Sequence, residues 1–146
     1  MRIDSNARKG VWTPALTFVT PGDLAIGYAA NGQIGEWYLD NGLLRLFFAI
    51  VASTFTHTTA SGALRISGSP FVAKTLTGMV WSGSLNRITG ITKASYTDFS
   101  CGVVSAANDI QVIANGSGVA LSAVTAADVP TGSTKTFVGA VSYPVA

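Results

Sequence analysis

The segment from Gly42 to Ala52, GLLRLFFAIVA, is apolar on both faces of any β-strand that it forms. Side chains of a strand point alternately to its two faces. One face of this segment carries Leu44, Leu46, Phe48, Ile50 and Ala52, and the other carries Leu43, Arg45, Phe47, Ala49 and Val51. A strand in a small two-layer protein usually buries one face and exposes the other to water. The sequence therefore predicts that something covers the second face.

The amino-acid composition points the same way. The chain has 146 residues, the length of one ordinary domain with a core of its own. Hydrophobic residues make up 48% of it and charged residues only 11%, whereas charged residues make up about 25% of a typical soluble domain. We infer that Ser, Thr, Asn and Gly solvate part of the surface, and that another part is hidden against other copies of the chain.

The sequence argues against several kinds of partner and site. A net charge of +2 with no basic stripe disfavours nucleic acid. The apolar run around Arg45 is far shorter than the ~20 residues of a membrane-spanning helix, and no charged and then apolar signal segment opens the chain. We therefore expect no membrane insertion and no export signal. One cysteine and one histidine, without a cluster at ligand spacing, predict no disulfide framework, no metal and no cofactor.

Short apolar segments alternate with Gly, Asn, Thr and Pro along most of the chain, which is typical of an antiparallel β-sandwich or barrel. We expect an all-β fold with one sandwich module over 11–146. Residues 1–10, MRIDSNARKG, are polar and aperiodic, and we interpret them as a lead-in or junction to upstream domains. The expected strands are 11–18, 24–29, 34–39, 43–53, 62–67, 76–82, 86–92, 102–106, 110–114, 119–124 and 136–143.

The turn at Asp40, Asn41 and Gly42 is the strongest hairpin signal in the chain. A tight type I′ turn needs positive φ at its two central residues, and Asn-Gly adopts that conformation readily. The strands before and after this turn should therefore pair.

No arrangement of residues points to catalysis. The one histidine, His57, lies in a Thr-rich segment and is expected in an exposed loop. Most carboxylates, among them Asp23 and Asp128, fall in or near turns, where Asp commonly accepts backbone hydrogen bonds. Cys101 has no activating neighbour in the sequence and is expected to be a buried, small apolar residue. We therefore expect a protein that is not an enzyme.

Aromatic residues with polar neighbours are the candidates for ligand binding, because sugar rings stack on exposed aromatic side chains while amides, carboxylates and guanidinium groups bind the hydroxyls. Alternatively, these aromatic side chains pack in the core or in the contacts between subunits. Trp37 and Tyr38 are adjacent and must point to opposite faces of a strand, so at most one of them is core. The weak ligand-binding candidates are Trp37, Trp81, Asn86, Arg87, Tyr96 and Asp98.

Four stretches resemble the C-terminal modules of bacteriophage tail fibres and tailspikes. They are GVWTPALTF at 10–18, GEWYLDNGLLRLFFAI at 35–50, SGALRISGSPF at 61–71, and TAADVPTGSTKTFVGAVSY at 125–143. The resemblance covers most of the chain and is weakest over 72–118. Three positions depart from the usual pattern: Trp37 stands where Tyr is usual, Ser69 where Leu is usual, and the closing segment after Gly139 has one extra residue.

The resemblance implies a β-sandwich of jelly-roll type that assembles as a parallel homotrimer at the distal end of a fibre. One face of the 43–52 strand would then pack inside its own sandwich, while the other faces the threefold axis or the neighbouring subunit. The candidate subunit-interface residues are Leu43, Arg45, Phe47, Ala49 and Val51. A buried Arg45 would need a carboxylate at that contact, and Asp98 or Asp109 are the first guesses.

The leading functional hypothesis is a non-enzymatic virion module that attaches a phage to a glycan or protein receptor on the bacterial surface. Such a protein is made in the host cytoplasm and resides in the virion. One alternative is a purely structural trimerisation or capping module of a fibre, spike or head fibre. Another is a monomeric carbohydrate-binding domain, and an esterase or glycosidase comes last.

Overall fold

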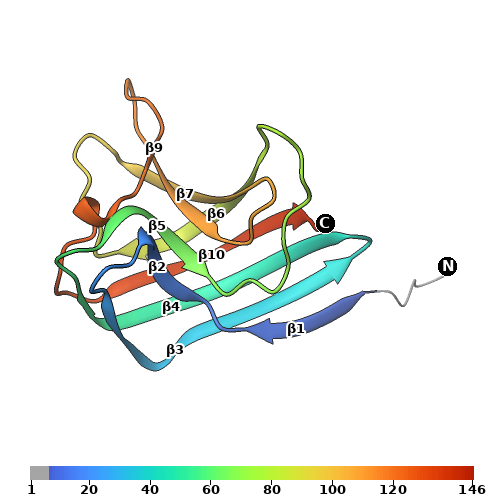
Figure 1. The fold of residues 1–146 in the computed structure, drawn as a ribbon, viewed down its shortest axis with the longest axis horizontal. Coiled ribbons are helices and arrows are strands. Elements are labelled where there is room, and N and C mark those ends of the chain that lie inside the picture. Colours follow the sequence, from blue (N-terminus) through green and yellow to red (C-terminus); the bar gives the residue numbers. More distant parts are fainter. Residues whose placement is uncertain (1–6) are drawn as a thin grey trace.

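The computed structural model describes residues 7–146, and these form an all-β fold, as expected (Figure 1). In this part of the chain the only helical structure is one 3-10 turn, so no helix there is long and apolar enough to cross a membrane. The elements are β1 Arg8–Trp12, β2 Ala15–Thr20, β3 Ala25–Asp40, β4 Leu43–Thr56, β5 Ser61–Ser67, β6 Val80–Thr89, β7 Asp98–Val104, β8 Ile110–Asn115, β9 Ser122–Ala123, η1 Ala126–Asp128 and β10 Lys135–Pro144.

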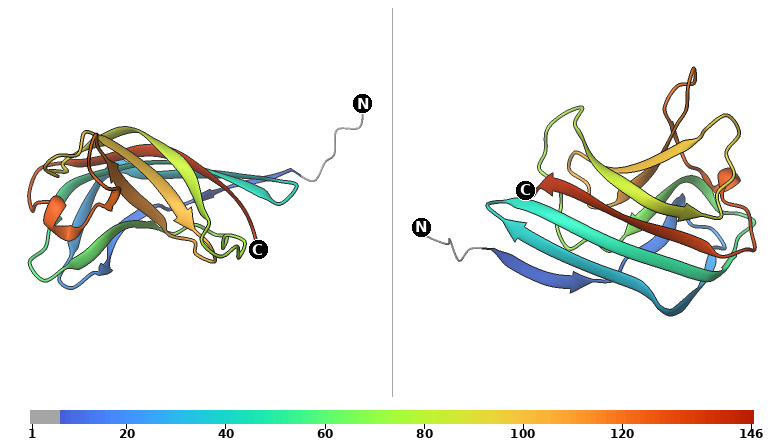
Figure 2. Two further views of the ribbon diagram at one scale, coloured as in Figure 1. Left: turned by 90° about the horizontal axis from the view of Figure 1, so that it is seen from above. Right: turned by 180° about the vertical axis from the view of Figure 1, so that it is seen from behind.

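All ten strands belong to one antiparallel sheet in the order β1-β3-β4-β10-β6-β7-β8-β5-β2, with β9 added beside β8. The sheet curls so that its two halves pack as layers, as the views in Figure 2 show. Its two edge strands, β1 and β2, are consecutive in the chain and are joined by Thr13 and Pro14. The two layers of the expected β-sandwich are therefore parts of one continuous sheet.

The core lies between the layers, and β4 supplies its central row. Leu44, Leu46, Phe48, Ile50 and Ala52 are each at most 3% exposed, so the first face of this strand is buried, as expected. They pack with buried residues of the other layer, including Leu64, Ile66, Val103 and Val112. Full burial of a side chain of this size contributes about 1.5–3 kcal/mol, so this row is a main source of stability.

The hairpin between β3 and β4 confirms the turn expected at 40–42. Asn41 has φ 47° and Gly42 has φ 76°, the positive angles that a type I′ turn requires. Asp40 and Leu43 face each other as the first cross-strand pair. This hairpin sets the register that places every even-numbered residue from Leu44 to Ala52 in the core.

Several expected strands have different limits. The expected strand 11–18 is divided at Pro14, which has no N–H for a ladder. The expected pair 24–29 and 34–39 forms one strand, β3, with irregular pairing between Tyr28 and Gln33. The pair 76–82 and 86–92 likewise merges into β6, while residues 76–79 form a turn.

Two further boundaries also differ. Of the expected strand 119–124, only the short β9 forms. Strand β1 begins at Arg8, inside the segment interpreted as a lead-in, because it pairs with β3 from Arg8 onward. Residues 1–6 of that segment lie outside the described residues.

Candidate functional site

The solvent side of β3, β4, β10 and β6, here called the outer face, carries an unusual number of exposed apolar side chains. Ile34 is 51% exposed, Phe47 45%, Tyr38 42% and Leu43 39%. Contiguous exposed apolar surface of this kind marks an interaction site more often than a solvated surface. The strand register brings these residues together in rungs, such as Glu36, Phe47, Ala140 and Ser84 across the four strands.

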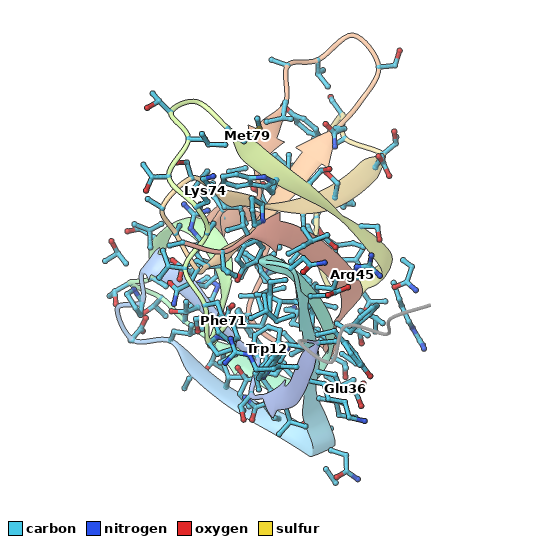
Figure 3. The ribbon with its side chains drawn as sticks, turned by 90° about the vertical axis from the view of Figure 1, so that its right-hand side faces the viewer. Trp12, Glu36, Arg45, Phe71, Lys74 and Met79 are labelled. Atoms are coloured by element: carbon cyan, nitrogen blue, oxygen red, sulfur yellow. The ribbon has the colours of Figure 1, made fainter. Side chains whose placement is uncertain are left out.

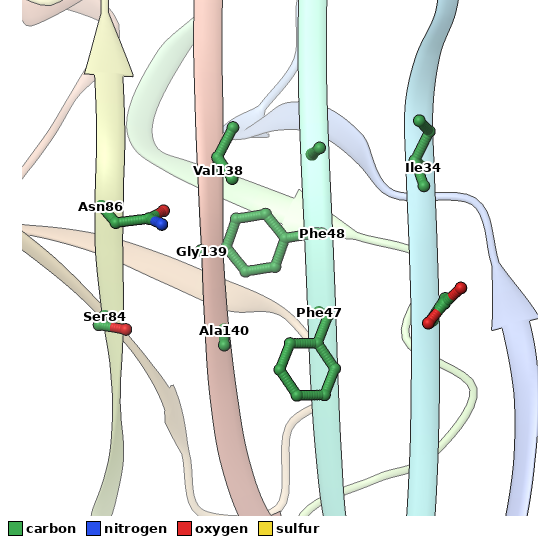
Figure 4. A pocket seen from close by; sticks show the side chains of 10 residues that line it. Ile34, Phe47, Phe48, Ser84, Asn86, Val138, Gly139 and Ala140 are labelled. Carbon is green, nitrogen blue, oxygen red and sulfur yellow. The ribbon is translucent and has the colours of Figure 1, made fainter.

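A depression of about 370 Å³ lies at the centre of the outer face (Figure 4). Its floor is made of small residues, Ala49, Gly139 and Ala140. A Cβ on Gly139 would lie 2.3 Å from the carbonyl oxygen of Ser84, so only glycine fits where β10 and β6 approach so closely. The remaining lining residues are Ile34, Glu36, Phe47, Phe48, Ser84, Asn86 and Val138.

A β-bulge in β6 places Asn86 at the edge of this depression. Arg87 pairs with Val138 and Leu85 pairs with Gly139, so Asn86 is an additional residue without a partner on β10. A bulge of this kind turns two successive side chains toward one face. Asn86 and Arg87 are accordingly both exposed on the outer face.

A second depression of about 550 Å³ lies beside the first and combines charged with aromatic groups. The rings of Tyr38 and Phe47 meet edge to face with centroids 5.9 Å apart. The Tyr38 hydroxyl donates a hydrogen bond to Glu36 Oε2 at 3.1 Å. This bond and the charge of Glu36 raise the pKa of Tyr38. Arg45, Asp40, Leu43 and Ala7 complete the lining.

All five candidate interface residues lie on the outer face. Leu43, Arg45 and Phe47 are exposed, and Ala49 and Val51 are partly exposed. Among residues 7–146 one ion pair forms, between Lys93 and Asp128, so Arg45 has no ion-pair partner in this part of the chain. Asp98 lies at the start of β7, so the guess that it or Asp109 pairs with Arg45 across subunits stays a prediction.

The six candidate ligand-binding residues do not form one cluster. Asn86 and Arg87 lie together on the bulge, and Asp98 is exposed on β7, opposite Asn115. Trp37 and Trp81 are half-buried and pack against the core, Trp37 edge to face with Phe71 at 5.0 Å. The Tyr96 hydroxyl donates to the carbonyl oxygen of Ala120 at 2.9 Å. Ligand binding by these residues stays a prediction.

Sequence reasoning missed half of the outer face. Ile34, Glu36, Tyr38, Val138 and Ala140 line it beside β4. The alternation within 34–40 could have identified the first three, because Tyr38 must point away from the face of Trp37. The residues of β10 carry no local signal, since only their pairing with β4 brings them to this face.

His57 and Cys101, the two residues considered as catalytic groups, both pack into the structure of the sheet. His57 is half-buried rather than exposed, which corrects the expectation of an exposed loop histidine. Its Nε2 lies 2.8 Å from the carbonyl oxygen of Val129, and its ring packs edge to face with Phe18 at 5.3 Å. Cys101 is 1% exposed, as expected, and burial raises the pKa of its thiol to about 12.

Residues 7–146 contain no group of three or more His, Cys, Asp or Glu side chains placed to hold a metal ion.

Two carboxylates expected at turns accept hydrogen bonds from backbone N–H groups. Asp23 accepts hydrogen bonds from the N–H groups of Thr58 and Thr59 at 2.8 Å and 2.7 Å. Asp128 accepts one from the N–H of Thr125 at 2.8 Å.

The fold of this curled antiparallel sheet is similar to part of a phage tailspike structure. That structure, the Dettilon tailspike protein (gp208), superposes with a TM-score of 0.70 at 15% sequence identity. The match covers 96% of this chain and 24% of the tailspike chain, so this chain spans about a quarter of the tailspike's length. No protein-family model and no curated protein sequence matches the chain.

Proposed function

We propose that this chain is a non-enzymatic module of a phage tail fibre or tailspike, which assembles as a homotrimer through its outer face and attaches the virion to its host. The observation that carries the proposal is the exposed apolar surface of β3, β4 and β10. The likeness to the Dettilon tailspike protein supports the phage setting. The protein would be made in the host cytoplasm and reside in the virion beside upstream fibre or spike domains.

The energetic argument for assembly rests on the second face of β4. In a single chain Leu43 and Phe47 stay in contact with water. Burying ~1,000 Å² of apolar surface against sister chains contributes roughly 25 kcal/mol before the entropy costs of association. Such burial also explains why only 11% of the residues are charged, since less surface needs to be solvated.

Attachment to a host would benefit from the trimer through avidity. Three weak sites on one rigid module bind a surface more tightly than any single site does. Arg87 and Asp98 are exposed and available to polar groups of a bacterial glycan or protein receptor. The Arg87 guanidinium fits hydroxyl and carboxylate groups, and the Asp98 carboxylate accepts hydrogen bonds from hydroxyl groups.

A second candidate is a purely structural trimerisation or capping module. The scatter of the six candidate ligand residues over core and surface favours it. A glycan array probed with the purified assembly distinguishes the two. Binding to bacterial glycans supports attachment, whereas an assembly that binds neither glycans nor host cells is the structural module.

Assembly through the outer face is tested by Phe47→Asp, with Val19→Asp as the control. Both are exposed apolar side chains on strands, Phe47 at 45% and Val19 at 60%, but Val19 lies on β2, away from the outer face. Light scattering behind a sizing column should give about three chain masses for the wild type and for Val19→Asp, and one chain mass for Phe47→Asp. A monomeric wild type would contradict the proposal and favour a monomeric carbohydrate-binding domain.

A further inference from the structure

Three charged side chains, Glu36, Asp40 and Arg45, lie close together on the apolar outer face. Arg45 sits between Tyr38 on β3 and Ser142 on β10. Glu36 and Asp40 occupy the neighbouring outward positions of β3, one on each side of Tyr38. All three line the same depression of about 550 Å³. Figure 3 shows Arg45 and Glu36 on the same side of the molecule.

These charges are tolerated in a single chain because water solvates them. Covering the face removes that water, and a buried charge without a partner is very unfavourable. In residues 7–146 no carboxylate forms an ion pair with Arg45, since the ion pair there is Lys93 with Asp128. An occupant of the face must therefore bring a carboxylate to Arg45 and a cation to the acidic groups.

A second copy of this chain satisfies both needs. Its own outer face offers the same guanidinium and the same carboxylates, so the face is complementary in charge to itself. In a cyclic assembly, one part of the outer face of each copy contacts a different part of the outer face of the next copy. Arg45 of one copy can therefore approach an acidic residue of the next. A partner with only one sign of charge would leave either Arg45 or the carboxylates unpaired.

Glu36 is the better partner of the two acidic residues. It faces Phe47 across the strands and lines both depressions, so it lies toward the middle of the apolar surface. Asp40 lies at the end of β3 beside the hairpin turn, at the rim. The Tyr38 hydroxyl also holds the Glu36 carboxylate in place at 3.1 Å, which reduces the ordering that a new contact requires.

We propose that Arg45 of one copy forms an ion pair with Glu36 of the neighbouring copy, and that this pair sets the register of the assembly. The inference rests on the assembly through the outer face proposed above. Planar guanidinium and carboxylate groups can form two parallel hydrogen bonds, which fixes geometry as well as energy. The pair would thus align apolar surfaces that could otherwise slide.

The test uses charge reversal on the full chain. Arg45→Glu and Glu36→Arg each place two like charges at the contact, so each variant alone should lose assembly and run at the mass of one chain. The double variant Arg45→Glu/Glu36→Arg should assemble again. Arg65→Glu on β5, where Arg65 faces Thr17 and Gln111, is the matched control and should assemble like the wild type. Circular dichroism melts check that every variant folds.

Mixing the two single variants separates a pair between copies from a pair within one chain. With one variant tagged, part of the untagged variant should be recovered with it, because two of the three contacts in a mixed trimer pair opposite charges. The third contact keeps two like charges, so the recovery should be lower than for the double variant. If the double variant assembles but the mixture does not, the pair lies within one chain and the proposal is wrong. Single variants that assemble like the wild type also overturn it. A monomeric wild type refutes the proposed function itself, so the two failures are distinguishable.

Discussion

Ser69 and Tyr143 share a buried hydrogen bond between their hydroxyl groups, with the oxygens 2.6 Å apart. The Tyr143 hydroxyl lies 2.8 Å from the carbonyl oxygen of Phe71, and Tyr143 is fully buried. Burial raises the pKa of Tyr143, so the phenol stays protonated and able to donate. The Ser69 hydroxyl gives the buried phenol a polar partner that an apolar side chain could not provide.

Removing this hydroxyl should destabilise the fold. In Tyr143→Phe the carbonyl of Phe71 and the hydroxyl of Ser69 each lose one hydrogen-bond partner and keep only the long bond of 3.4 Å between them. The loss of a partner at a buried site typically costs about 1–3 kcal/mol. Urea denaturation should show this loss in the free energy of unfolding. Tyr96→Phe is the control, because its hydrogen bond to Ala120 is exposed and should contribute less than about 1 kcal/mol. Equal losses in the free energy of unfolding for the two variants would show that the buried hydrogen bonds of Tyr143 contribute no more than the exposed one of Tyr96.

Two connections at one end of the sheet are held together by Asp23. This residue lies in the turn between β2 and β3, and it accepts hydrogen bonds from Thr58 and Thr59 in the connection between β4 and β5. Gly22 in the same turn has φ 56° and lies close to Thr59, so the turn is shaped for this contact. The carboxylate thus joins two connections that are about 35 residues apart in the chain.

These bonds predict a dependence of stability on pH. Hydrogen bonds from Thr58 hold the pKa of Asp23 well below the usual value of about 4. A carboxylate with a lowered pKa in the folded state stabilises fully above about pH 4, and the effect is lost as the pH falls toward the lowered pKa. Asp23→Asn should therefore melt at a lower temperature at pH 7 and differ less from the wild type at pH 2.5. Equal differences at both pH values would exclude this role.

The sheet as a whole depends on its last strand. Strand β10 lies between β4 and β6 and forms ladders with both, so it connects β1, β3 and β4 to the rest of the sheet. It also contributes Val138 and Ala140 to the outer face. The proposed interface is therefore complete only when the C-terminal strand has paired, which couples assembly to folding of the whole chain.

This coupling predicts that thermal stability depends on protein concentration. By mass action, association stabilises the folded chain more at higher concentration. The melting temperature of the wild type should rise between samples about 100-fold apart in concentration, measured by circular dichroism, and that of Phe47→Asp should stay constant. A wild type whose melting temperature does not change would show that folding proceeds without assembly.

The sequence by itself determined the local features of this protein. It predicted the hairpin at Asn41 and Gly42, the alternation of β4 and the opposite directions of Trp37 and Tyr38, because each depends only on neighbouring residues. The tertiary structure decided which residues share a face. The bulge at Asn86, the burial of His57 beside Phe18 and the place of β10 all arise from pairing between distant segments. The alternation of side chains with period two shows which face of a strand is apolar, but it does not show which strand lies beside it.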